Sequence, residues 1–245
     1  MDKYGLIGKN ISYSFSKDFF NTKFEAKAIK NASYQNFDIE SILDFPKVLK
    51  DHPELKGLNV TIPYKELVIP YLDKLDKKAK KIGAVNTIKI NKKGRLIGYN
   101  TDCYGFKKTL KPFMKPHHKK ALILGTGGAS KAIAYGLKKM KIDYSFVSRN
   151  ASEHTTYSYH DLSENDIKNN QILINCTPLG TFPNIEACPN IPYQAISSKH
   201  ILFDLIYNPI ETKFLALGKA KNATTINGLK MLELQANKAW EIWNS

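Results

Sequence analysis

Residues 119–137 read KKALILGTGGASKAIAYGL, and they indicate the fold of the second half of the chain. A short apolar run, 121–124, leads into the turn Gly125-Thr126-Gly127-Gly128 and then an amphipathic segment from Ala129. The first glycine permits a tight turn, and Gly127 lets the backbone approach a pyrophosphate. The start of the following helix supplies free N–H groups and a positive dipole for phosphate charge. The stretch predicts a strand, a turn and a helix that bind a dinucleotide.

The glycine pattern departs at one position from the usual dinucleotide fingerprint. Ser130 stands where a third glycine is common. Such a pattern is weak evidence by itself, and the strand–turn–helix context strengthens it. A plain glycine-rich turn between a strand and a helix stays open as the alternative.

The sequence around this stretch continues as a regular alternation of strands and helices. Short apolar runs are typical of parallel strands that helices cover on both faces. They occur at residues 121–124, 144–147, 172–174, 201–205 and 224–226. The pattern predicts a Rossmann fold, a doubly wound parallel sheet.

The residues after the second of these strands indicate which dinucleotide binds. An NAD site normally has an acidic residue at this strand tip, where it binds the ribose 2′-hydroxyl. This chain has Ser148-Arg149-Asn150 instead. A planar guanidinium is suited to a 2′-phosphate, so Arg149 favours NADP(H) over NAD. The alternative is that Arg149 is an ordinary surface cation after a strand.

The first part of the chain has a different pattern, with shorter and less regular elements. Strands are expected at 4–7, 34–38, 57–60, 86–90 and 95–99. Helices are expected at 17–30, at 39–50 with a disturbance at Pro46, and at 104–115 before Pro116. Apolar residues from 229 to 243 form one helical stripe. We expect domains at 1–101 and 102–228, with helix 229–245 packing back on the first.

Two serines precede the first expected helix. Ser14 and Ser16 lie in the sequence ISYSFS, and two hydroxyls at a helix N-terminus can bind a carboxylate. The alternative is simple N-capping by Ser16.

Two further polar clusters lie at expected strand ends. In GLNVTIPYK, Asn59 and Thr61 point the same way from an extended chain, and Lys65 could serve in acid–base chemistry. Asn86 lies in AVNT, and Asp102 lies where the two expected domains meet. Lys65 could instead be one lysine among many, and Asp102 could be an N-cap of the helix at Tyr104.

Composition restricts the class of protein. The 245 residues are 42% hydrophobic and 24% charged, with a net charge of +15. The lysines are spread at helical spacing, which favours solvated helix faces over a nucleic-acid surface. No run approaches the roughly 18 apolar residues of a membrane span, and MDKYGLIGKN is unlike a signal peptide. The three cysteines suit a reducing, cytoplasmic compartment, and the histidines form no HxxH or HExxH motif. We expect no metal, no nucleic-acid partner and no membrane partner.

Taken together, the motifs resemble those of the shikimate dehydrogenase family from Tyr4 to Trp243. In order they are GLIG, the two serines, GLNVTIPYK, GAVNT, GYNTDCYGF, GTGGAS, SRN, INCTPLG, DLIYNP and NGLKMLELQ. The resemblance implies a mixed-sheet α/β substrate domain, a Rossmann domain and an active site in the cleft between them. It also implies reversible, NADPH-dependent reduction of 3-dehydroshikimate to shikimate in the pathway to chorismate and the aromatic amino acids. We expect a monomer or homodimer.

The resemblance also implies roles for individual residues. Lys65 and Asp102 would be the catalytic pair, and which of the two transfers the proton stays open. The substrate would be bound by Ser14, Ser16, Asn59, Thr61, Asn86, Tyr207 and Gln235. The cofactor would be bound by Gly125, Thr126, Gly127, Gly128, Ala129, Ser148, Arg149, Thr177, Leu205, Gly228 and Met231.

The chain departs from the family pattern at a few positions. Tyr13 and Lys17 replace a usual histidine and proline, Ser148 and Asn150 replace a usual asparagine and threonine, and Cys176 replaces a usual alanine. Two relatives of the same class stay open as alternatives at this point: a quinate-accepting dehydrogenase and a methylenetetrahydrofolate-type dehydrogenase. The paired serines argue against the second. A basic nucleic-acid-binding module is the alternative from another class, and it would require lysines and exposed aromatic residues on one face.

Overall fold

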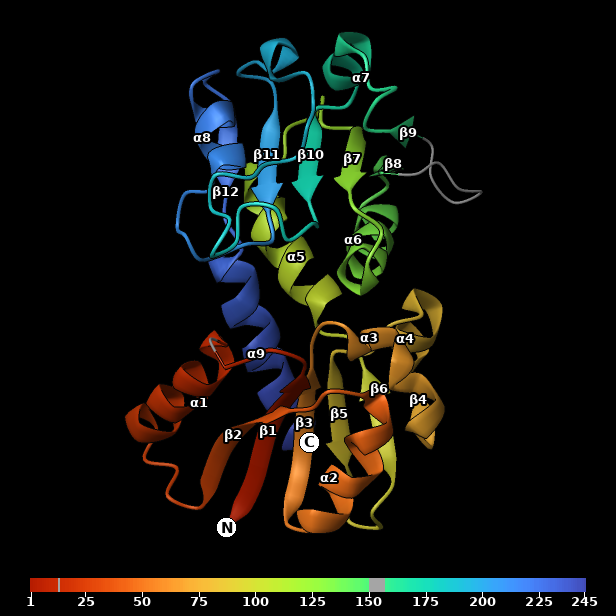
Figure 1. Ribbon diagram of the computed structural model, residues 1–245, viewed down its shortest axis with the longest axis vertical. Coiled ribbons are helices and arrows are strands. Elements are labelled where there is room, and N and C mark those ends of the chain that lie inside the picture. Colours follow the sequence, from red (N-terminus) through yellow and green to blue (C-terminus); the bar gives the residue numbers. More distant parts are fainter. Residues whose placement is uncertain (13, 150–156) are drawn as a thin grey trace. The chain divides into compact units, whose positions relative to one another are not determined.

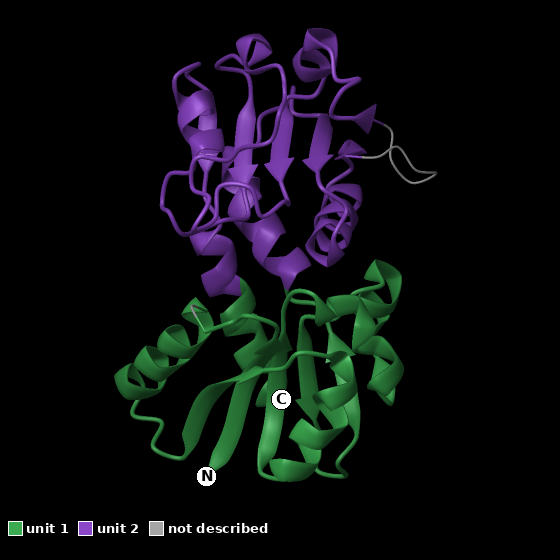
Figure 2. Ribbon diagram, viewed as in Figure 1, with its two compact units in different colours: residues 1–101, 235–245 green, residues 102–234 purple. Residues whose placement is uncertain are grey.

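The structure is a computed structural model that describes residues 1–12, 14–149 and 157–245. Tyr13 and Asn150, two of the departures from the family pattern, lie outside the described residues. The chain divides into two compact units (Figure 2). The first contains residues 1–101 and 235–245, and the second contains residues 102–234. The chain crosses from one unit to the other after Thr101 and after Leu234.

The second unit is built on a parallel sheet with the strand order β12-β11-β10-β7-β8-β9 (Figure 1). Every strand pair in this sheet is parallel. The order reverses between β7 and β10, and ligands of such sheets bind at the carboxyl ends of the strands at this point. The predicted Rossmann sheet is therefore confirmed. The strands are β7 (Lys120–Leu124), β8 (Asp143–Ser148), β9 (Tyr157–Ser158), β10 (Ile172–Asn175), β11 (Ile201–Asp204) and β12 (Thr224–Ile226).

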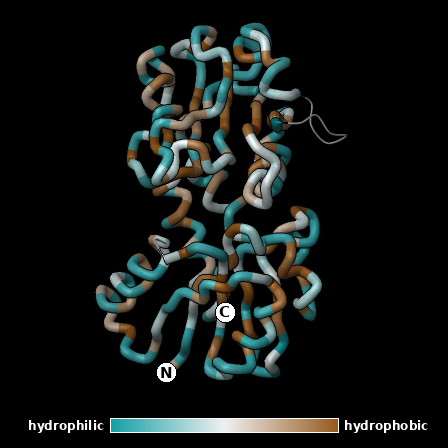
Figure 3. Tube along the Cα trace, in the orientation of Figure 1, coloured by the Kyte–Doolittle hydropathy of each residue, from teal (hydrophilic) through white to brown (hydrophobic). Residues whose placement is uncertain are grey.

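Alternate strand residues of this sheet fill two separate cores. Ile123 and Ile174 pack with Phe106 on one face, while Leu122 and Leu173 pack with Phe214 on the other. Both faces are therefore buried, which explains why the strands read as continuous apolar runs (Figure 3). The helices of this unit are α5 (Asp102–Leu110), η3 (Lys111–Phe113), α6 (Gly128–Lys139), α7 (Glu164–Asn169), η4 (Tyr193–Ala195) and α8 (Lys213–Lys219).

The first unit has a mixed sheet with the order β2-β1-β3-β5-β6-β4. β1 pairs in parallel with β2 and β3, whereas β5 is antiparallel to both β3 and β6. Its strands are β1 (Asp2–Gly8), β2 (Ala32–Asp38), β3 (Leu55–Val60), β4 (Lys74–Leu75), β5 (Thr87–Ile90) and β6 (Leu96–Tyr99). Its helices are α1 (Phe15–Ala26), η1 (Ile42–Asp44), α2 (Phe45–Asp51), α3 (Tyr64–Leu67), η2 (Ile69–Tyr71) and α4 (Lys77–Ile82).

The last helix, α9 (Leu229–Trp243), contributes its C-terminal half to the core of the first unit. Trp243 packs with Tyr4, Phe20 and Ala239, and its indole N–H donates to the carbonyl of Ile88 at 2.9 Å. A Cβ at Gly57 would lie 2.2 Å from the indole nitrogen of Trp243. The glycine of the GLNVTIPYK motif is thus required by the close approach of the tryptophan, 186 residues later in the chain.

Three expected helices have different bounds in the structure, and the one expected at 104–115 is α5 followed by η3. The first was expected at 17–30, but α1 begins at Phe15 and ends at Ala26. Ala28 takes a left-handed conformation (φ 52°), and the N–H of Ile29 donates to the carbonyl of Phe24 at 2.8 Å. This is a Schellman-type helix end, in which glycine usually occupies the left-handed position. Since alanine stands at this position, the usual glycine that marks a helix end is missing from the sequence.

The second of these helices, expected at 39–50 with Pro46 as a disturbance, is divided into η1 and α2. Ser41 caps η1 by accepting a hydrogen bond from the N–H of Leu43. Pro46 lies in the first turn of α2, where its missing N–H costs nothing. The proline therefore starts a helix instead of interrupting one. None of the described helices is long and apolar enough to cross a membrane.

Candidate active site

The serine pair lies at the start of α1, and the structure corrects the capping alternative. Ser14, not Ser16, is the N-cap residue, and its hydroxyl oxygen accepts a hydrogen bond from the N–H of Ser16 at 3.3 Å. Ser16 is buried in the first turn of the helix, while Ser14 is half-buried. Two hydroxyls and a positive helix end thus lie within one turn, an arrangement suited to a carboxylate.

A cluster of neutral polar side chains is buried at the ends of β3 and β5 in the first unit. The amide NH2 of Asn86 donates to the hydroxyl of Thr101 at 2.9 Å and to the side-chain carbonyl of Gln235 at 3.2 Å. The side-chain carbonyl of Asn86 accepts from the backbone N–H of Thr101 at 2.7 Å. Asn59 joins the same cluster by donating to the hydroxyl of Thr87 at 3.3 Å. The cluster brings together Asn59, Asn86 and Gln235, three of the residues that the sequence proposed.

Thr87 and Thr101 belong to this cluster, and the sequence reasoning did not propose them. Both are almost fully buried, at 0% and 1% exposure. They stand next to Asn86 and Asp102 within the quoted motifs GAVNT and GYNTD, and this adjacency was the signal available. Among the described residues the NH2 group of Gln235 has no hydrogen-bond partner, so it can donate to a ligand hydroxyl.

Lys65 and Asp102 are each placed next to elements of this cluster by the backbone. Lys65 is half-buried on α3, and its backbone carbonyl accepts from the N–H of Val85 at 2.7 Å. Asp102 is 6% exposed and follows Thr101 directly in the chain. α5 begins at Asp102, two residues earlier than the expected helix start at Tyr104. The carboxylate is therefore in the first turn of that helix, not at a cap preceding Tyr104.

The glycine turn in the second unit has the conformation that a pyrophosphate site requires. Gly125 has φ 102°, a region that side chains rarely adopt, and a Cβ there would lie 3.0 Å from the methyl group of Thr177. A Cβ at Gly127 would have nothing within 4 Å, so the backbone faces open space. α6 begins at Gly128 with no side-chain cap, which leaves its first N–H groups to an anion. These residues fit the diphosphate of a dinucleotide.

The departure at Ser130 has a structural explanation. Its hydroxyl donates to the carbonyl of Gly127 at 2.6 Å, and its own N–H reaches the same carbonyl at 2.9 Å. Ser130 is fully buried in the first turn of α6. A serine is compatible with the close packing that usually selects glycine, because the only polar atom of its side chain forms a hydrogen bond within the turn.

The residues proposed to recognise the 2′-phosphate lie at the carboxyl end of β8. Ser148 is the last residue of β8, and its carbonyl accepts from the N–H of Tyr159 at 3.1 Å. Arg149 follows it and is exposed. β8 is adjacent to β7, whose end carries Gly125. In a Rossmann sheet this position faces the adenosine end of the dinucleotide.

The loops after β10 and β11 are fixed to each other by buried hydrogen bonds. The side-chain carbonyl of Asn175 accepts from the N–H and the hydroxyl of Thr177, at 3.0 and 2.6 Å. Its NH2 group donates to the carboxylate of Asp204 at 3.1 Å. That carboxylate also accepts from the hydroxyl of Thr212 and from the N–H of Ile206. Thr177, Leu205 and Tyr207, all proposed from the sequence, lie on these two loops.

Gly228 lies where the last strand of the sheet leads into α9. A Cβ at this position would lie 2.1 Å from the backbone carbonyl oxygen of Leu205. The N–H of Gly228 donates to the carbonyl of Ile206 at 2.9 Å. Met231, one turn later, is buried in the core of the second unit. Gly228 and Leu205 are therefore in direct contact, whereas Met231 supports the start of α9 from within the core.

Asp204 is the buried titratable group of these loops, and we expect it to make stability depend on pH. Burial raises the pKa of its carboxyl to about 6 from 3.8, although three hydrogen bonds lower it in part. The folded state then binds this proton more tightly than the unfolded state does. The cost of ionisation therefore develops as pH rises from about 4 to about 6, and stability falls over that range.

The test is Asp204→Asn, whose amide can keep all three hydrogen bonds if Thr212 accepts one. The difference in unfolding free energy between the variant and the original should shift in favour of the variant by about 2–3 kcal/mol between pH 4 and pH 7. Urea titrations at both pH values measure it. A difference that is the same at the two pH values would contradict the assignment to Asp204.

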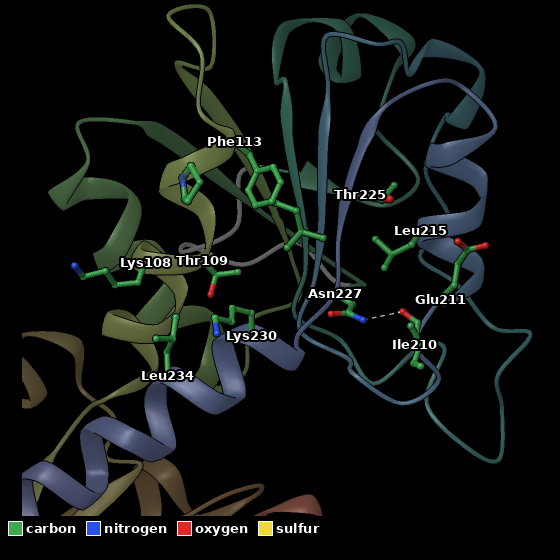
Figure 4. Close-up of a pocket in the computed structure, with 12 residues that line it drawn as sticks. Lys108, Thr109, Phe113, Ile210, Glu211, Leu215, Thr225, Asn227, Lys230 and Leu234 are labelled. Atoms are coloured by element: carbon green, nitrogen blue, oxygen red, sulfur yellow. Dashed lines mark hydrogen bonds between the residues drawn. The ribbon is translucent and has the colours of Figure 1, made fainter. Parts of the chain in front are cut away.

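A pocket of about 510 Å³ lies beside β12 in the second unit (Figure 4). It lies among α5, η3, β12 and the start of α9, and one wall is closed by the bond from the Asn227 amide to the carbonyl of Ile210 at 3.0 Å. None of the site residues proposed from the sequence lines it. The pocket is thus separate from the glycine turn and from the loop after β10, while Ile210 and Glu211 of the loop after β11 form part of its wall. In the described part of the chain, no three His, Cys, Asp or Glu side chains are grouped closely enough to hold a metal ion.

Comparisons with known proteins identify the family of this chain. The family model described as the shikimate dehydrogenase substrate binding domain matches residues 6–88. A shikimate dehydrogenase (NADP(+)) of Clostridium beijerinckii is 40% identical over 258 residues, which cover 99% of this chain and 92% of the relative.

Solved structures give the same result over the whole chain. Shikimate dehydrogenase from Aquifex aeolicus aligns with a TM-score of 0.89 and 35% identity, covering 100% of this chain and 92% of that one. The Thermus thermophilus enzyme in complex with NADP(H) and shikimate aligns with a TM-score of 0.87 and 29% identity, covering 99% and 93%. This chain belongs to the shikimate dehydrogenase family.

Proposed function

We propose that this protein is an NADP-dependent shikimate dehydrogenase that reversibly reduces 3-dehydroshikimate to shikimate. The observation that carries the proposal is the buried cluster of Asn59, Asn86, Thr101 and Gln235. It collects neutral donors and acceptors from three distant parts of the chain. Such a cluster suits a polyhydroxylated ring, since buried amides and hydroxyls pair with hydroxyl groups. The NADP complex of a structural relative supports the choice of cofactor.

The substrate is assigned to polar side chains that the family pattern indicates. Ser14 and Ser16 bind its carboxylate, where two hydroxyls and the positive end of α1 favour an anion. Thr61, Asn86 and Gln235 bind ring hydroxyls, Asn59 supports them through Thr87 and the carbonyl of Asn86, and Tyr207 completes the set. These roles follow from residue chemistry together with the family pattern.

The cofactor is assigned to residues of the second unit. The N–H groups of the turn Gly125-Thr126-Gly127-Gly128-Ala129 bind the diphosphate at the uncapped start of α6. Ser148 and Arg149 bind the 2′-phosphate, which selects NADP over NAD. Thr177, Leu205, Gly228 and Met231 form the part of the site next to the nicotinamide. When bound, the cofactor supplies or accepts a hydride.

The chain's own contribution to the chemistry is charge stabilisation and proton transfer. As hydride adds to the carbonyl carbon, the carbonyl oxygen becomes negative. The Lys65 ammonium donates a hydrogen bond to that oxygen and then the proton, so the product is an alcohol and the lysine a neutral amine. The Asp102 carboxylate accepts a hydrogen bond from a ring hydroxyl and holds the lysine in position. The reverse reaction uses the neutral amine as the base.

The proposed function is tested by following NADPH absorbance with purified protein. Shikimate and quinate are each assayed with NADP and with NAD. We expect turnover of shikimate with NADP to exceed that of the three other pairings. Faster turnover of quinate would assign the protein to the quinate-accepting relatives, and no turnover with either substrate would overturn the proposal.

The paired serines give a prediction about substrate affinity. We expect the double variant Ser14→Ala/Ser16→Ala to raise KM for shikimate roughly five- to tenfold with KM for NADP unchanged, because two donors to the carboxylate are lost while the end of α1 remains. Steady-state kinetics measures both constants. Ser163→Ala is the matched control, since Ser163 is also an N-cap serine, on α7. If the double variant keeps the original KM, the serines only cap the helix.

We further propose that the protein acts on small molecules in the cytoplasm, as a monomer or homodimer. Cys103, Cys176 and Cys188 form no disulfide, which suits a reducing compartment. Light scattering coupled to gel filtration measures the oligomeric state. A gel shift at physiological salt tests the proposed absence of nucleic-acid binding despite the net charge of +15.

A further inference from the structure

The loop that carries the paired serines is held by one face of β2. Residues 34, 36 and 38 are alternate positions of this strand and therefore point to the same side. The carboxylate of Asp38 accepts from the N–H groups of Asn10 and Ile11, at 2.8 and 3.0 Å. The amide of Asn36 donates to the carbonyl of Ile11 at 3.0 Å, and the same carbonyl accepts from the N–H of Ser14.

Tyr34 is the third member of this face, and its phenol lies between two groups assigned to the substrate. Its hydroxyl donates to the side-chain carbonyl of Asn59 at 2.8 Å. The side chain of Ser16 lies next to the same phenol and lowers its pKa in part. The ring is 3% exposed and stacks on Phe20, with centroids 4.4 Å apart and planes inclined by 12°. Burial raises the pKa of Tyr34 well above its usual value, so the hydroxyl keeps its proton.

The directions of these hydrogen bonds follow from the donors available. The NH2 group of Asn59 donates to the carbonyl of Asn86 and to the hydroxyl of Thr87, both at 3.3 Å. The side-chain carbonyl of Asn59 must then face Tyr34, which commits the single phenol proton to it. The phenol oxygen keeps its lone pairs and can accept from the neighbouring hydroxyl of Ser16.

We propose that Tyr34 is a positioning residue for the substrate: it connects the serines that bind the carboxylate to the asparagine that supports ring-hydroxyl recognition. It fixes the orientation of the Asn59 amide and holds the Ser16 hydroxyl in place through one buried phenol. Tyr34 does not touch the substrate in this proposal, which rests on the proposed function. The two ends of the substrate are thus recognised by side chains that share one hydrogen-bond network.

The test is Tyr34→Phe, which removes the hydroxyl and keeps the ring that stacks on Phe20. We expect KM for shikimate to rise roughly three- to tenfold, the effect of one or two lost hydrogen bonds, with KM for NADP unchanged and kcat within about twofold. Tyr4→Phe is the matched control, because Tyr4 is equally buried in the same core and is remote in sequence from the serine loop. It should leave both KM values unchanged.

A double-mutant cycle separates positioning from a general loss of stability. In a Ser16→Ala background, Tyr34→Phe should raise KM for shikimate less than it does alone, since the hydroxyl that Tyr34 is proposed to position is already absent. In an Arg149→Ala background, Tyr34→Phe should raise KM for shikimate by the same factor as it does alone. Full additivity with Ser16→Ala would overturn the proposal.

A second variant covers the case in which Tyr34→Phe does not fold. Asp38→Asn weakens the hold of β2 on Asn10 and Ile11 without touching the core. It should also raise KM for shikimate and leave KM for NADP unchanged. If the original enzyme has no activity on shikimate, the proposed function has failed. If the original enzyme is active and both variants keep its KM for shikimate, only the proposal about Tyr34 and its strand β2 has failed.

Discussion

Replacing Lys65 by alanine should lower kcat roughly a hundred- to a thousandfold while shikimate still binds. The lysine ammonium meets the charge that develops on the carbonyl oxygen, and removal of such a donor typically costs roughly 2.7–4 kcal/mol of transition-state stabilisation. The matched control is Lys78→Ala, an exposed lysine on the neighbouring helix α4. A normal kcat in Lys65→Ala would exclude Lys65 from the mechanism.

Asp102 should behave as the partner of Lys65 and not as an independent contributor. We expect Asp102→Asn to lower kcat and to raise KM for shikimate, because the carboxylate is assigned to a ring hydroxyl as well as to the lysine. Groups that act as a unit are strongly non-additive, so the double variant should be little worse than Lys65→Ala alone. Steady-state kinetics on the two single variants and the double variant, with thermal melts, measures this.

A purely structural role for Asp102 gives a different result. Loss of a helix-start carboxylate would reduce stability by about 1 kcal/mol with near-normal turnover. Losses in kcat that simply multiply in the double variant would show that the two residues do not act as a pair.

Replacing Arg149 by alanine should weaken NADP binding roughly ten- to a hundredfold and leave NAD binding almost unchanged. The reason is the loss of a guanidinium–phosphate contact worth roughly 1.5–3 kcal/mol. Dissociation constants for both cofactors, from fluorescence titration, measure it. The chain has only two arginines, and Arg95→Ala is the matched control, since Arg95 is exposed in the turn between β5 and β6. Equal affinities of the unmodified protein for NAD and NADP would contradict the assignment.

The Rossmann half of the chain was predictable in detail from its sequence. The parallel strands bury both faces, so apolar residues are continuous in the sequence, and five of the six strands were visible locally. The two-residue strand β9 was not expected. The turn after β7 requires Gly125 at φ 102° and an open backbone at Gly127, and glycine is the residue that satisfies both demands. The function of this turn was also predictable from the sequence, because the proposed phosphate site is built from backbone groups of a single continuous segment.

The first half was less predictable because its signals depend on distant residues. The strand β4 has two residues and exists through its pairing with β6, at Lys74 with Ile97 and Leu75 with Gly98. The end of α1 lacks the usual glycine because Ala28 accepts the left-handed conformation. The alternative of N-capping by Ser16 was also wrong. Two serines that lie two residues apart both fit an N-cap, and because α1 begins at Phe15, Ser14 is the N-cap residue.

Local sequence patterns predicted the type of each element that has a regular period, the position of the dinucleotide turn and the family. Which buried polar side chains form hydrogen bonds with one another became known from the three-dimensional structure. Asn86 and Gln235 are 149 positions apart and Tyr34 and Asn59 are 25 apart, yet each pair is joined by a buried hydrogen bond. No periodicity encodes such a pair, because a buried donor takes whichever acceptor the packing of distant strands and helices brings within about 3 Å.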